Sequence, residues 1–372
     1  MSRYVAVLLF LHLQSAAQPA PDSIPAALEA RVVPLLAQHS VPGVGLAVVN
    51  GGQVVFVGGI GVCESNTGLK VTAQTRFQAA SISKPLAALT VLRLVRKGLV
   101  SLDEDVHDRL SSWQLPTPNF TSREPLTPRS LLMHRGGINL EGSWGYSARM
   151  QPIPSLLQTL TGTGVRKEDS AVRQKYPPGK FHYSTGGYCI LEQWLVDALK
   201  SPYPTLVQEE VFGPLGMRGS DFLLFPHDSA NGTYASGHGK NGVIEGKRYG
   251  YPFAAAAGWN TSATDVAQLL VGMIAAWQGR DTTWLRRADL EPLTHTRPGS
   301  DYGLGWRIEL SESGDVQALY HRGLNTGFLS IVKLYPEIGY GVGILTNSQN
   351  SAEVIEAIGG IVRELFPPVV TE

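Results

Sequence analysis

Apolar and polar positions follow two different periods along the chain. An amphipathic run over residues 24–38 predicts a helix, and strand-like runs follow at 44–49 and 54–60. Asn50-Gly51-Gly52 between the two runs is a hairpin signal. Strand patterns return only near the C-terminus, at 305–310, 317–320, 328–335 and 341–346, before a predicted closing helix at 352–365.

The stretch between the two β-rich ends, residues 84–295, carries mostly helical patterns and loops rich in Pro and Gly. This arrangement predicts an α+β fold, in which both chain ends build one antiparallel sheet flanked by helices and a mostly helical lobe is inserted between them. We therefore expect a single domain over 18–372. Its sheet lobe would comprise about 24–80 and 300–372, and its helical lobe about 84–295.

The first residues predict a secretory signal peptide. Arg3 precedes an apolar run from Tyr4 to Leu13, and Ser15-Ala16-Ala17 supplies small residues at a cleavage point near Ala17. Removal of residues 1–17 would give a secreted or periplasmic protein. The run is too short to span a bilayer, so we expect no stable membrane anchor. A buried N-terminal helix is the alternative, although the polar, Pro-rich QPAPDSIP follows.

Composition and charge narrow the range of partners. The 372 residues are 43% apolar and 17% charged, and Lys plus Arg equals Asp plus Glu at 31 each. A balanced chain of this kind indicates a neutral small-molecule substrate, and neither a nucleic acid nor an anionic membrane. Cys63 and Cys189 could pair outside the cytoplasm, but we expect two buried free thiols. The scattered histidines show no metal-binding spacing, so we expect no metal and no cofactor.

Ser81 and Lys84 form the most informative chemical pattern. Apolar positions, Pro85 in a first turn and Gly98 as a stop predict a helix over 85–97. Residues three apart share a helix face, so Lys84 can reach the Ser81 oxygen at the N-terminal end, where unpaired amides favour an oxyanion. The alternative is an N-cap serine beside a surface lysine.

The same spacing recurs at Ser330 and Lys333, but inside the strand-like run FLSIVKLY. On a strand, residues i and i+3 point to opposite faces, so these two side chains cannot cooperate. No Gly-x-Ser-x-Gly elbow occurs in the chain, which disfavours an α/β-hydrolase.

Three downstream stretches support Ser81 as a nucleophile. They are YPPGKFHYSTGGY around Tyr183, Tyr302-Gly-Leu-Gly-Trp306 and His321-Arg322-Gly323. In this order the chain resembles the serine β-lactamase-like superfamily, in the branch of class C β-lactamases, DD-peptidases, D-aminopeptidases and family VIII carboxylesterases. The resemblance spans nearly the whole mature chain and implies an active site in a cleft between the two lobes.

The resemblance also implies roles for particular residues. Ser81 would be the nucleophile, with Lys84 and Tyr183 as a coupled proton-accepting pair. Backbone amides of Ser81 and Leu324 would form the oxyanion hole. Gly323 would leave room for a substrate to lie against its strand.

Two positions depart from the β-lactamase pattern. Thr185 stands where the resembling enzymes often have an asparagine that contacts a substrate amide. His321 stands where β-lactamases of this group carry a lysine, a fixed charge for a substrate carboxylate, whereas esterases and some peptidases carry histidine. Both residues are candidates for substrate binding, and both argue against an efficient β-lactamase.

Further family-like residues have a structural interpretation. We expect His134, in LLMHRGG, to tie a loop, and Asp265, in GWNTSATD, to cap or begin the following helix. Four aromatic residues are equally compatible with the cleft wall and with the core: Tyr188, Trp259, Tyr302 and Trp306.

The sequence thus predicts a secreted serine hydrolase that forms an acyl-enzyme on Ser81, with a carboxylesterase acting on small esters as the leading hypothesis. The alternatives are a D-amino-acid peptidase or DD-carboxypeptidase, a weak class C-like β-lactamase, or an enzyme that transfers its acyl group to an alcohol. A binding or scaffold protein without turnover is the alternative of another class.

Overall fold

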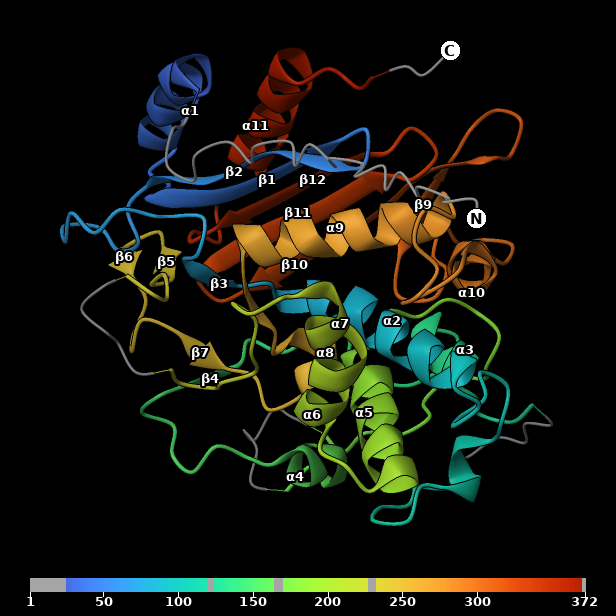
Figure 1. Ribbon diagram of the computed structural model, residues 1–372. Helices are drawn as coiled ribbons and strands as arrows, with labels where there is room; N and C mark the ends of the chain where they lie inside the picture. The colour runs from blue at the N-terminus through green and yellow to red at the C-terminus, as the bar shows by residue number, and fades with distance from the viewer. Residues whose placement is uncertain (1–24, 119–123, 164–169, 227–231, 370–372) are drawn as a thin grey trace, which may run out of the picture.

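A six-stranded antiparallel sheet forms the centre of the computed structural model, which describes residues 25–118, 124–163, 170–226 and 232–369. The strand order is β2-β1-β12-β11-β10-β9, and β1 pairs with β12, so the two chain ends meet in the middle of the sheet (Figure 1). This confirms the expected α+β fold. The strands are β1 (Gly43–Asn50), β2 (Gln53–Gly61), β9 (Arg307–Leu310), β10 (Val316–Asn325), β11 (Phe328–Tyr335) and β12 (Tyr340–Thr346).

Helices cover both faces of the sheet. The terminal helices α1 (Ala26–Gln38) and α11 (Ala352–Leu365) pack together on one face (Figure 1). The other face is covered by α9 (Ala263–Trp277), which contacts β1, β2 and β12. Because it is covered on both sides, β1 is buried along almost its whole length. α9 thus packs on the sheet, although it falls within the range expected for the helical lobe.

The helical lobe is built around α2 (Ser83–Arg96) and α5 (Thr185–Leu199), both of which are largely buried. Between them lies the short α8 (Ala254–Ala257), which packs against both helices. The remaining elements are short: β3 (Arg76–Gln78), η1 (Ala80–Ile82), η2 (Val106–Asp108), α3 (Pro128–Leu132), β4 (Tyr146–Ser147), α4 (Leu156–Thr161), α6 (Tyr203–Val207), η3 (Gln208–Phe212), α7 (Gly213–Leu215), β5 (His238–Gly239), β6 (Gly242–Val243), β7 (Tyr249–Gly250), β8 (Asn260–Ser262), α10 (Arg287–Leu290) and η4 (Glu291–Thr294).

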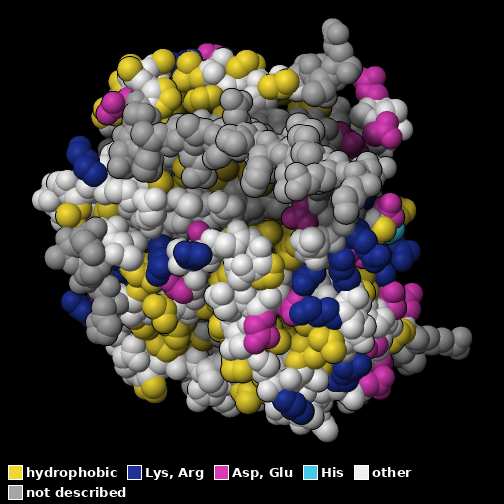
Figure 2. All heavy atoms as spheres, in the orientation of Figure 1, with side chains coloured by type: hydrophobic (Ala, Val, Ile, Leu, Met, Phe, Trp, Pro, Cys, Tyr) yellow, Lys and Arg dark blue, Asp and Glu magenta, His cyan; other side chains and the backbone are white. Residues whose placement is uncertain are grey.

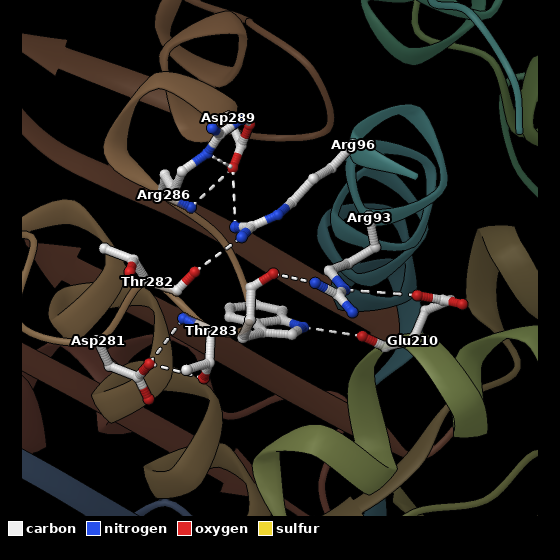
Figure 3. Close-up of polar contacts among 9 residues, drawn as sticks. Arg93, Arg96, Glu210, Asp281, Thr282, Thr283, Arg286 and Asp289 are labelled. Atoms are coloured by element: carbon white, nitrogen blue, oxygen red, sulfur yellow. Dashed lines mark hydrogen bonds and ion pairs between the residues drawn. The ribbon is translucent and has the colours of Figure 1, made fainter. Parts of the chain in front are cut away.

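Ion pairs anchor the C-terminal end of α2 to its neighbours (Figure 3). Arg96 lies 3.0 Å from a carboxylate oxygen of Asp289, and the Nε of Arg93 lies 3.4 Å from Glu210. Cations at this end of a helix also interact favourably with its dipole. The helix that follows Ser81 is therefore held at the end remote from the serine as well as at the site.

The surface carries charges of both signs. Figure 2 shows Lys and Arg side chains interspersed with Asp and Glu over the face in view, in keeping with the balanced composition. Among the described helices, none combines the length and the apolar character needed to cross a bilayer. The expected signal peptide, residues 1–17, lies outside the described residues.

The two cysteines follow the expectation from the sequence. Cys63 and Cys189 are both buried, and neither forms a disulfide. Burial raises the pKa of each thiol, so both remain protonated at neutral pH.

Candidate active site

Ser81 lies in η1, a single tight turn that runs directly into α2. The preceding Ala80 has a positive φ of 53°, a conformation that residues other than glycine adopt rarely and that often marks a functional site. Lys84, one turn further on, donates from Nζ to the Ser81 Oγ across 3.1 Å. The predicted pairing of serine and lysine on one helix face is therefore present, although the α-helix proper begins at Ser83.

Lys84 is fully buried. Its Nζ also donates to the carbonyl oxygen of Ala256 in α8, at 2.9 Å. The nitrogen lies 4.9 Å from the ring centroid of Tyr183 and 5.5 Å from that of Tyr188. None of the ion pairs found among the described residues involves Lys84. The amine is thus held by oxygen acceptors and aromatic rings beside the serine.

Tyr183 stands immediately before α5, whose N-cap is Ser184. The Ser184 hydroxyl accepts from the Gly187 amide at 2.9 Å and donates to the carbonyl of Asn139 at 2.7 Å. The Ser184 amide donates to Nδ1 of His134 at 3.0 Å. These three bonds fix the backbone next to Tyr183, and its ring faces Lys84. The structure therefore brings Ser81, Lys84 and Tyr183 together.

His134 ties the loop before Tyr183, as expected. Since Nδ1 accepts from Ser184, the proton of the neutral ring sits on Nε2, which has no hydrogen-bond partner among the described residues. The ring packs against Tyr183 at 4.2 Å between centroids and against Tyr302 at 4.8 Å. Burial lowers its pKa well below the usual value, and the nearby Lys84 acts in the same direction. His134 is thus a neutral, buried part of the support for Tyr183.

Asp265 also has a structural role. It lies in the first turn of α9, where its amide donates to the N-cap Ser262 and its carboxylate accepts from the Ser220 hydroxyl at 2.7 Å. Four aromatic residues could have belonged either to the cleft wall or to the core. All four are fully buried and belong to the core: Tyr188, Trp259, Tyr302 and Trp306.

The strand β10 borders the site along an open edge. It pairs with β11 as far as Asn325, but β9 pairs with it only up to Tyr320, so residues 321–325 have no strand neighbour on the side of η1. The sequence predicted a strand that ended at residue 320. In the structure the strand continues to Asn325. The sequence pattern did not show this because the buried positions beyond residue 320 are not apolar: His321, Gly323 and Asn325.

His321 is neutral and fully hydrogen-bonded. Its Nδ1 lies 2.7 Å from the carbonyl of Arg322, which can only accept, so Nδ1 carries the proton. Its Nε2 then accepts from the Tyr302 hydroxyl at 2.9 Å. Burial lowers the pKa of His321 to about 3, with Lys84 adding to the effect. Both ring nitrogens thus have partners within the protein, and the expected substrate-binding role of His321 stays a prediction.

Gly323 is required by a close approach of the backbone. A Cβ at this position would lie 2.1 Å from the carbonyl oxygen of Ala79, just ahead of the turn that carries Ser81. The expectation that Gly323 leaves room for a substrate is therefore corrected: the space above its α-carbon is occupied by the Ala79 backbone. The contact locks the turn that carries Ser81 against β10.

The second serine–lysine pair behaves as predicted for a strand. Ser330 is buried and donates to the Ala79 carbonyl at 3.0 Å, whereas Lys333 lies 2.7 Å from Glu309 in an ion pair. The two side chains do not cooperate. Ser330 instead supports the same backbone segment that Gly323 contacts.

Thr185 and Leu324 have different surroundings. The Thr185 hydroxyl is buried and donates to the carbonyl of Glu141 at 3.1 Å, and its expected contact with a substrate stays a prediction. The Leu324 side chain is 51% exposed, and its backbone lies on the open part of β10. The oxyanion-hole role of Leu324 therefore stays a prediction.

A loop over residues 139–145 extends from the Tyr183 side to the β10–β11 hairpin. Beside Tyr183 it accepts from Ser184 and Thr185, and at its other end the Trp144 carbonyl accepts from Tyr251 at 3.1 Å and from Thr326 at 2.8 Å. Trp144 itself is 68% exposed. Sequence reasoning missed this residue, and its only signal was a tryptophan in a Gly- and Ser-containing loop. It also missed the Ala256 carbonyl, because a backbone acceptor leaves no trace in the sequence.

A cavity of about 570 Å³ borders Tyr183 and His321 at the β9–β10 edge. Three cations line it, and each is paired with a carboxylate: Arg307 with Asp301, Arg322 with Glu356 and Lys333 with Glu309. The cavity therefore offers no unpaired positive charge. No cluster of side chains suited to a metal ion was found in the described parts of the chain.

The chain is similar in sequence to several known proteins. A putative penicillin-binding protein, PbpX, of Bacillus subtilis (strain 168) is 24% identical over 177 residues, which are 47% of this chain and 40% of that protein. This chain spans 40% of that relative and 61% of the protein flp of Staphylococcus aureus (strain N315). The whole-protein activities of these relatives therefore do not transfer directly.

Two solved structures share the fold. The octameric penicillin-binding protein homologue from Pyrococcus abyssi matches with a TM-score of 0.72 and 24% identity, over 92% of this chain and 77% of that one. EstCE1, described as a hydrolase with promiscuous acyltransferase activity, matches with a TM-score of 0.69 and 20% identity, over 90% and 98% of the two chains.

The family model named Beta-lactamase matches residues 28–362. That match covers both lobes, with Ser81, Lys84, Tyr183 and the open edge of β10 inside it. The chain therefore belongs to the β-lactamase family of serine hydrolases.

Proposed function

We propose that the protein is a serine hydrolase that forms an acyl-enzyme on Ser81, and that it acts as a carboxylesterase on small neutral esters. The observation that carries this proposal is the buried Lys84 Nζ, 3.1 Å from the Ser81 Oγ and next to the ring of Tyr183. A serine hydroxyl needs an adjacent proton acceptor to attack a carbonyl carbon at neutral pH.

The proposed reaction has two halves. In the first, the Ser81 oxygen bonds to the ester carbonyl carbon, its proton passes to the Lys84–Tyr183 pair, and the amides of Ser81 and Leu324 hold the developing oxyanion. The bond to the alcohol oxygen then breaks, and the alcohol leaves with that proton. In the second half, water gives a proton to the same pair and attacks the acyl carbon. The acid is released, and Ser81 regains its proton.

A neutral substrate fits the charges around the site. β-Lactams and D-Ala-D-Ala peptides carry a carboxylate, and a buried carboxylate needs a cation or several donors. Here His321 is neutral with both nitrogens bonded, and the three cations of the adjoining cavity are paired. A neutral ester carries no charge and therefore needs neither a cation nor several hydrogen-bond donors.

The likeness to EstCE1, a hydrolase with promiscuous acyltransferase activity, supports hydrolase chemistry and also favours acyl transfer as a side activity. The penicillin-binding relatives support the rival reading, a D-amino-acid peptidase or DD-carboxypeptidase, and the family match keeps a weak β-lactamase as a second rival. All of these reactions pass through an acyl group on Ser81, so they are distinguished by which substrate the protein prefers.

The deciding experiment compares kcat/KM on three substrates: a short-chain nitrophenyl ester, a D-Ala-D-Ala peptide and a chromogenic cephalosporin. We expect the ester to be preferred by at least about tenfold. The matched control is Ser81→Ala, which should abolish turnover of all three. Preference for the peptide or the cephalosporin would replace the esterase proposal with the corresponding rival.

Intact-protein mass after treatment with a fluorophosphonate tests the chemistry apart from the substrate. We expect one adduct, absent in Ser81→Ala. No adduct on the wild-type protein would favour a binding or scaffold protein without turnover.

We also propose that the chain is exported after cleavage near Ala17, because the charged start, the short apolar run and the small residues have the order of a signal peptide. N-terminal sequencing of protein collected outside the cytoplasm should begin near Gln18. A mature protein that retains residues 1–17 would contradict this.

A further inference from the structure

The four-residue helix α8 lies where several parts of the site meet. Its Ala256 carbonyl accepts from Lys84 Nζ at 2.9 Å. Its Ala257 carbonyl accepts from the Asn325 side chain on β10 at 3.2 Å. Two successive carbonyls of α8 therefore contact the helix that carries the lysine and the strand that borders the cleft. Any shift of α8 along its axis would move the acceptor that holds Lys84.

α8 has no long side chain of its own with which to fix this position, since all four of its residues are alanine. Its N-terminal end is instead bound by Glu192, a buried residue of α5. One Glu192 carboxyl oxygen accepts from the Ala255 amide at 2.8 Å, and the Ala254 amide also hydrogen-bonds to the carboxyl group. Unpaired amides at the start of a helix are the natural donors to such a group.

We infer that Glu192 is a positioning residue for Lys84: it acts through α8, by holding the Ala256 carbonyl at the distance that keeps the lysine amine beside Ser81. The carboxyl binds one end of the helix and the lysine contacts the other, with only Ala254 and Ala255 preceding the carbonyl in question. The inference rests on the proposed acyl-enzyme chemistry of Ser81, but not on which ester is the substrate.

The titration of Glu192 provides a signature for this role. Burial raises its pKa to about 8, with the amides of Ala255 and Ala254 opposing the rise. Its titratable neighbours are Cys189 on α5 and Tyr203 on α6, and burial raises the pKa of both, so neither gains charge near neutral pH. As pH rises through about 8, Glu192 ionises and becomes a stronger acceptor for the α8 amides.

Asp197 provides a matched control on the same helix. It is also buried, and its Oδ2 accepts from the amides of Ser111 and Ser112, each at 2.8 Å. Like the contact of Glu192, it joins a carboxyl group of α5 to backbone amides, but it binds the 111–112 loop and not α8. Although burial opposes the change, hydrogen bonds from Ser112 and Ser111 lower the pKa of Asp197, so this carboxyl is ionised where that of Glu192 is protonated. Asp197→Ala therefore removes a carboxyl anchor from α5 without releasing the contact to Lys84.

The test measures the single-turnover rate of Ser81 acylation by a fluorophosphonate, followed by intact-protein mass, with kcat and KM on a nitrophenyl ester alongside. We expect Glu192→Ala to acylate about 10- to 100-fold more slowly, the usual scale for a small misplacement of a catalytic group. KM should stay within about twofold. Asp197→Ala should acylate within about twofold of the wild-type rate. A folded Glu192→Ala protein with wild-type acylation, or an equal loss in Asp197→Ala, would overturn the inference.

Glu192→Gln keeps the size of the side chain. It tests the positioning role of Glu192 if Glu192→Ala does not fold. Below pH 8 the neutral amide resembles the protonated acid, so acylation should be close to that of the wild type. Above pH 8 the wild type ionises and the variant does not, so the ratio of variant to wild-type rate should fall. A ratio that stays constant from pH 6 to 10 would count against the inference.

Amide hydrogen exchange of residues 255–257 tests the anchor without any turnover. Exchange should be faster in Glu192→Ala than in Asp197→Ala, or, where only the conservative variant folds, faster in Glu192→Gln than in the wild type above pH 8. If the wild-type protein itself fails to acylate, the proposed function fails, and the exchange data still decide whether Glu192 holds α8. Equal exchange in the compared proteins would overturn the inference on its own.

Discussion

The Tyr302 hydroxyl donates to Nε2 of His321 across 2.9 Å, and this bond holds the histidine in the neutral form that is protonated on Nδ1. The two residues come from different elements, one from the loop before β9 and the other from β10. Together they place an uncharged ring at the position where the resembling β-lactamases carry a lysine. The lack of a positive charge at this position therefore depends on both Tyr302 and His321.

His321→Lys should shift the substrate preference of the proposed hydrolase. A lysine here loses the Tyr302 bond but adds a charge, which should raise the ratio of cephalosporin to ester kcat/KM by about tenfold or more, the scale of one charge-assisted hydrogen bond. Tyr302→Phe is the control, because it removes the same bond and adds no charge. An unchanged ratio in a folded His321→Lys protein, or an equal rise in Tyr302→Phe, would place the discrimination elsewhere.

The two serines of the repeated spacing should respond differently to alanine. Ser81→Ala removes the proposed nucleophile and should abolish turnover. Ser330→Ala removes only the hydrogen bond to the Ala79 carbonyl, so we expect the chemistry to survive with a loss of about 1 kcal/mol in the free energy of unfolding. Activity assays and urea unfolding of both variants check this. Comparable losses of activity would contradict the separate roles.

Tyr183→Phe keeps the ring that packs on His134 and faces Lys84, and removes only the hydroxyl. If that hydroxyl shares a proton with Lys84, the acylation rate should fall by about two orders of magnitude with an intact fold. Single-turnover acylation and thermal unfolding separate the two effects. A variant that keeps most of its kcat would show that Tyr183 serves in packing.

The protonation of Glu192 should make stability depend on pH. Burial raises the pKa of its carboxyl from 4.5 to about 8, so the folded state binds the proton more tightly than the unfolded chain does. The free energy of unfolding should therefore fall as pH rises from about 4.5 to about 8 and level off above that, by a few kcal/mol in total. Glu192→Gln should flatten this slope, which urea unfolding at several pH values measures. An identical slope in the variant would assign the dependence to other groups.

Trp144 should contact the apolar part of larger esters. Its backbone is held by Tyr251 and Thr326 while the indole is exposed at the end of the 139–145 loop, which suits it as a rigid platform. Trp144→Ala should raise KM for an aryl or long-chain ester by about 3- to 10-fold and leave an acetyl ester within about twofold. Leu99→Ala, an exposed apolar residue at the opposite end of α2, is the control. Equal effects of the two variants would remove Trp144 from the binding surface.

Much of the fold could be predicted from the sequence because its signals are local. The hairpin at Asn50-Gly51-Gly52, the alternation over 328–335 and the apolar spacing after Ser81 depend on residues close together in the chain. The same holds for the pairing of Ser81 with Lys84 and for the failure of Ser330 to pair with Lys333, since helix and strand periods alone set which side chains share a face.

Other features needed segments that are far apart in the sequence. β10 runs on to Asn325 because it stays paired with β11 to that point, and the buried residues there are not apolar, so the local pattern did not show the extension. Gly323 is glycine because Ala79, far away along the chain, brings its carbonyl within 2.1 Å of where a Cβ would stand. Thr185 is turned toward the carbonyl of Glu141 for the same kind of reason.

By itself the sequence determined the family-like order of motifs, the sheet built from both ends of the chain, and the helix face shared by Ser81 and Lys84. These features follow from backbone periods and residue types. Only the tertiary structure decided the charge of His321, the acceptor for Lys84 and the anchor of that acceptor. Each of these depends on burial and on partners brought in from other elements, such as Tyr302 and Ala256. Such contacts change the affinity of a side chain for a proton, or the position of a carbonyl group, without leaving any pattern along the chain.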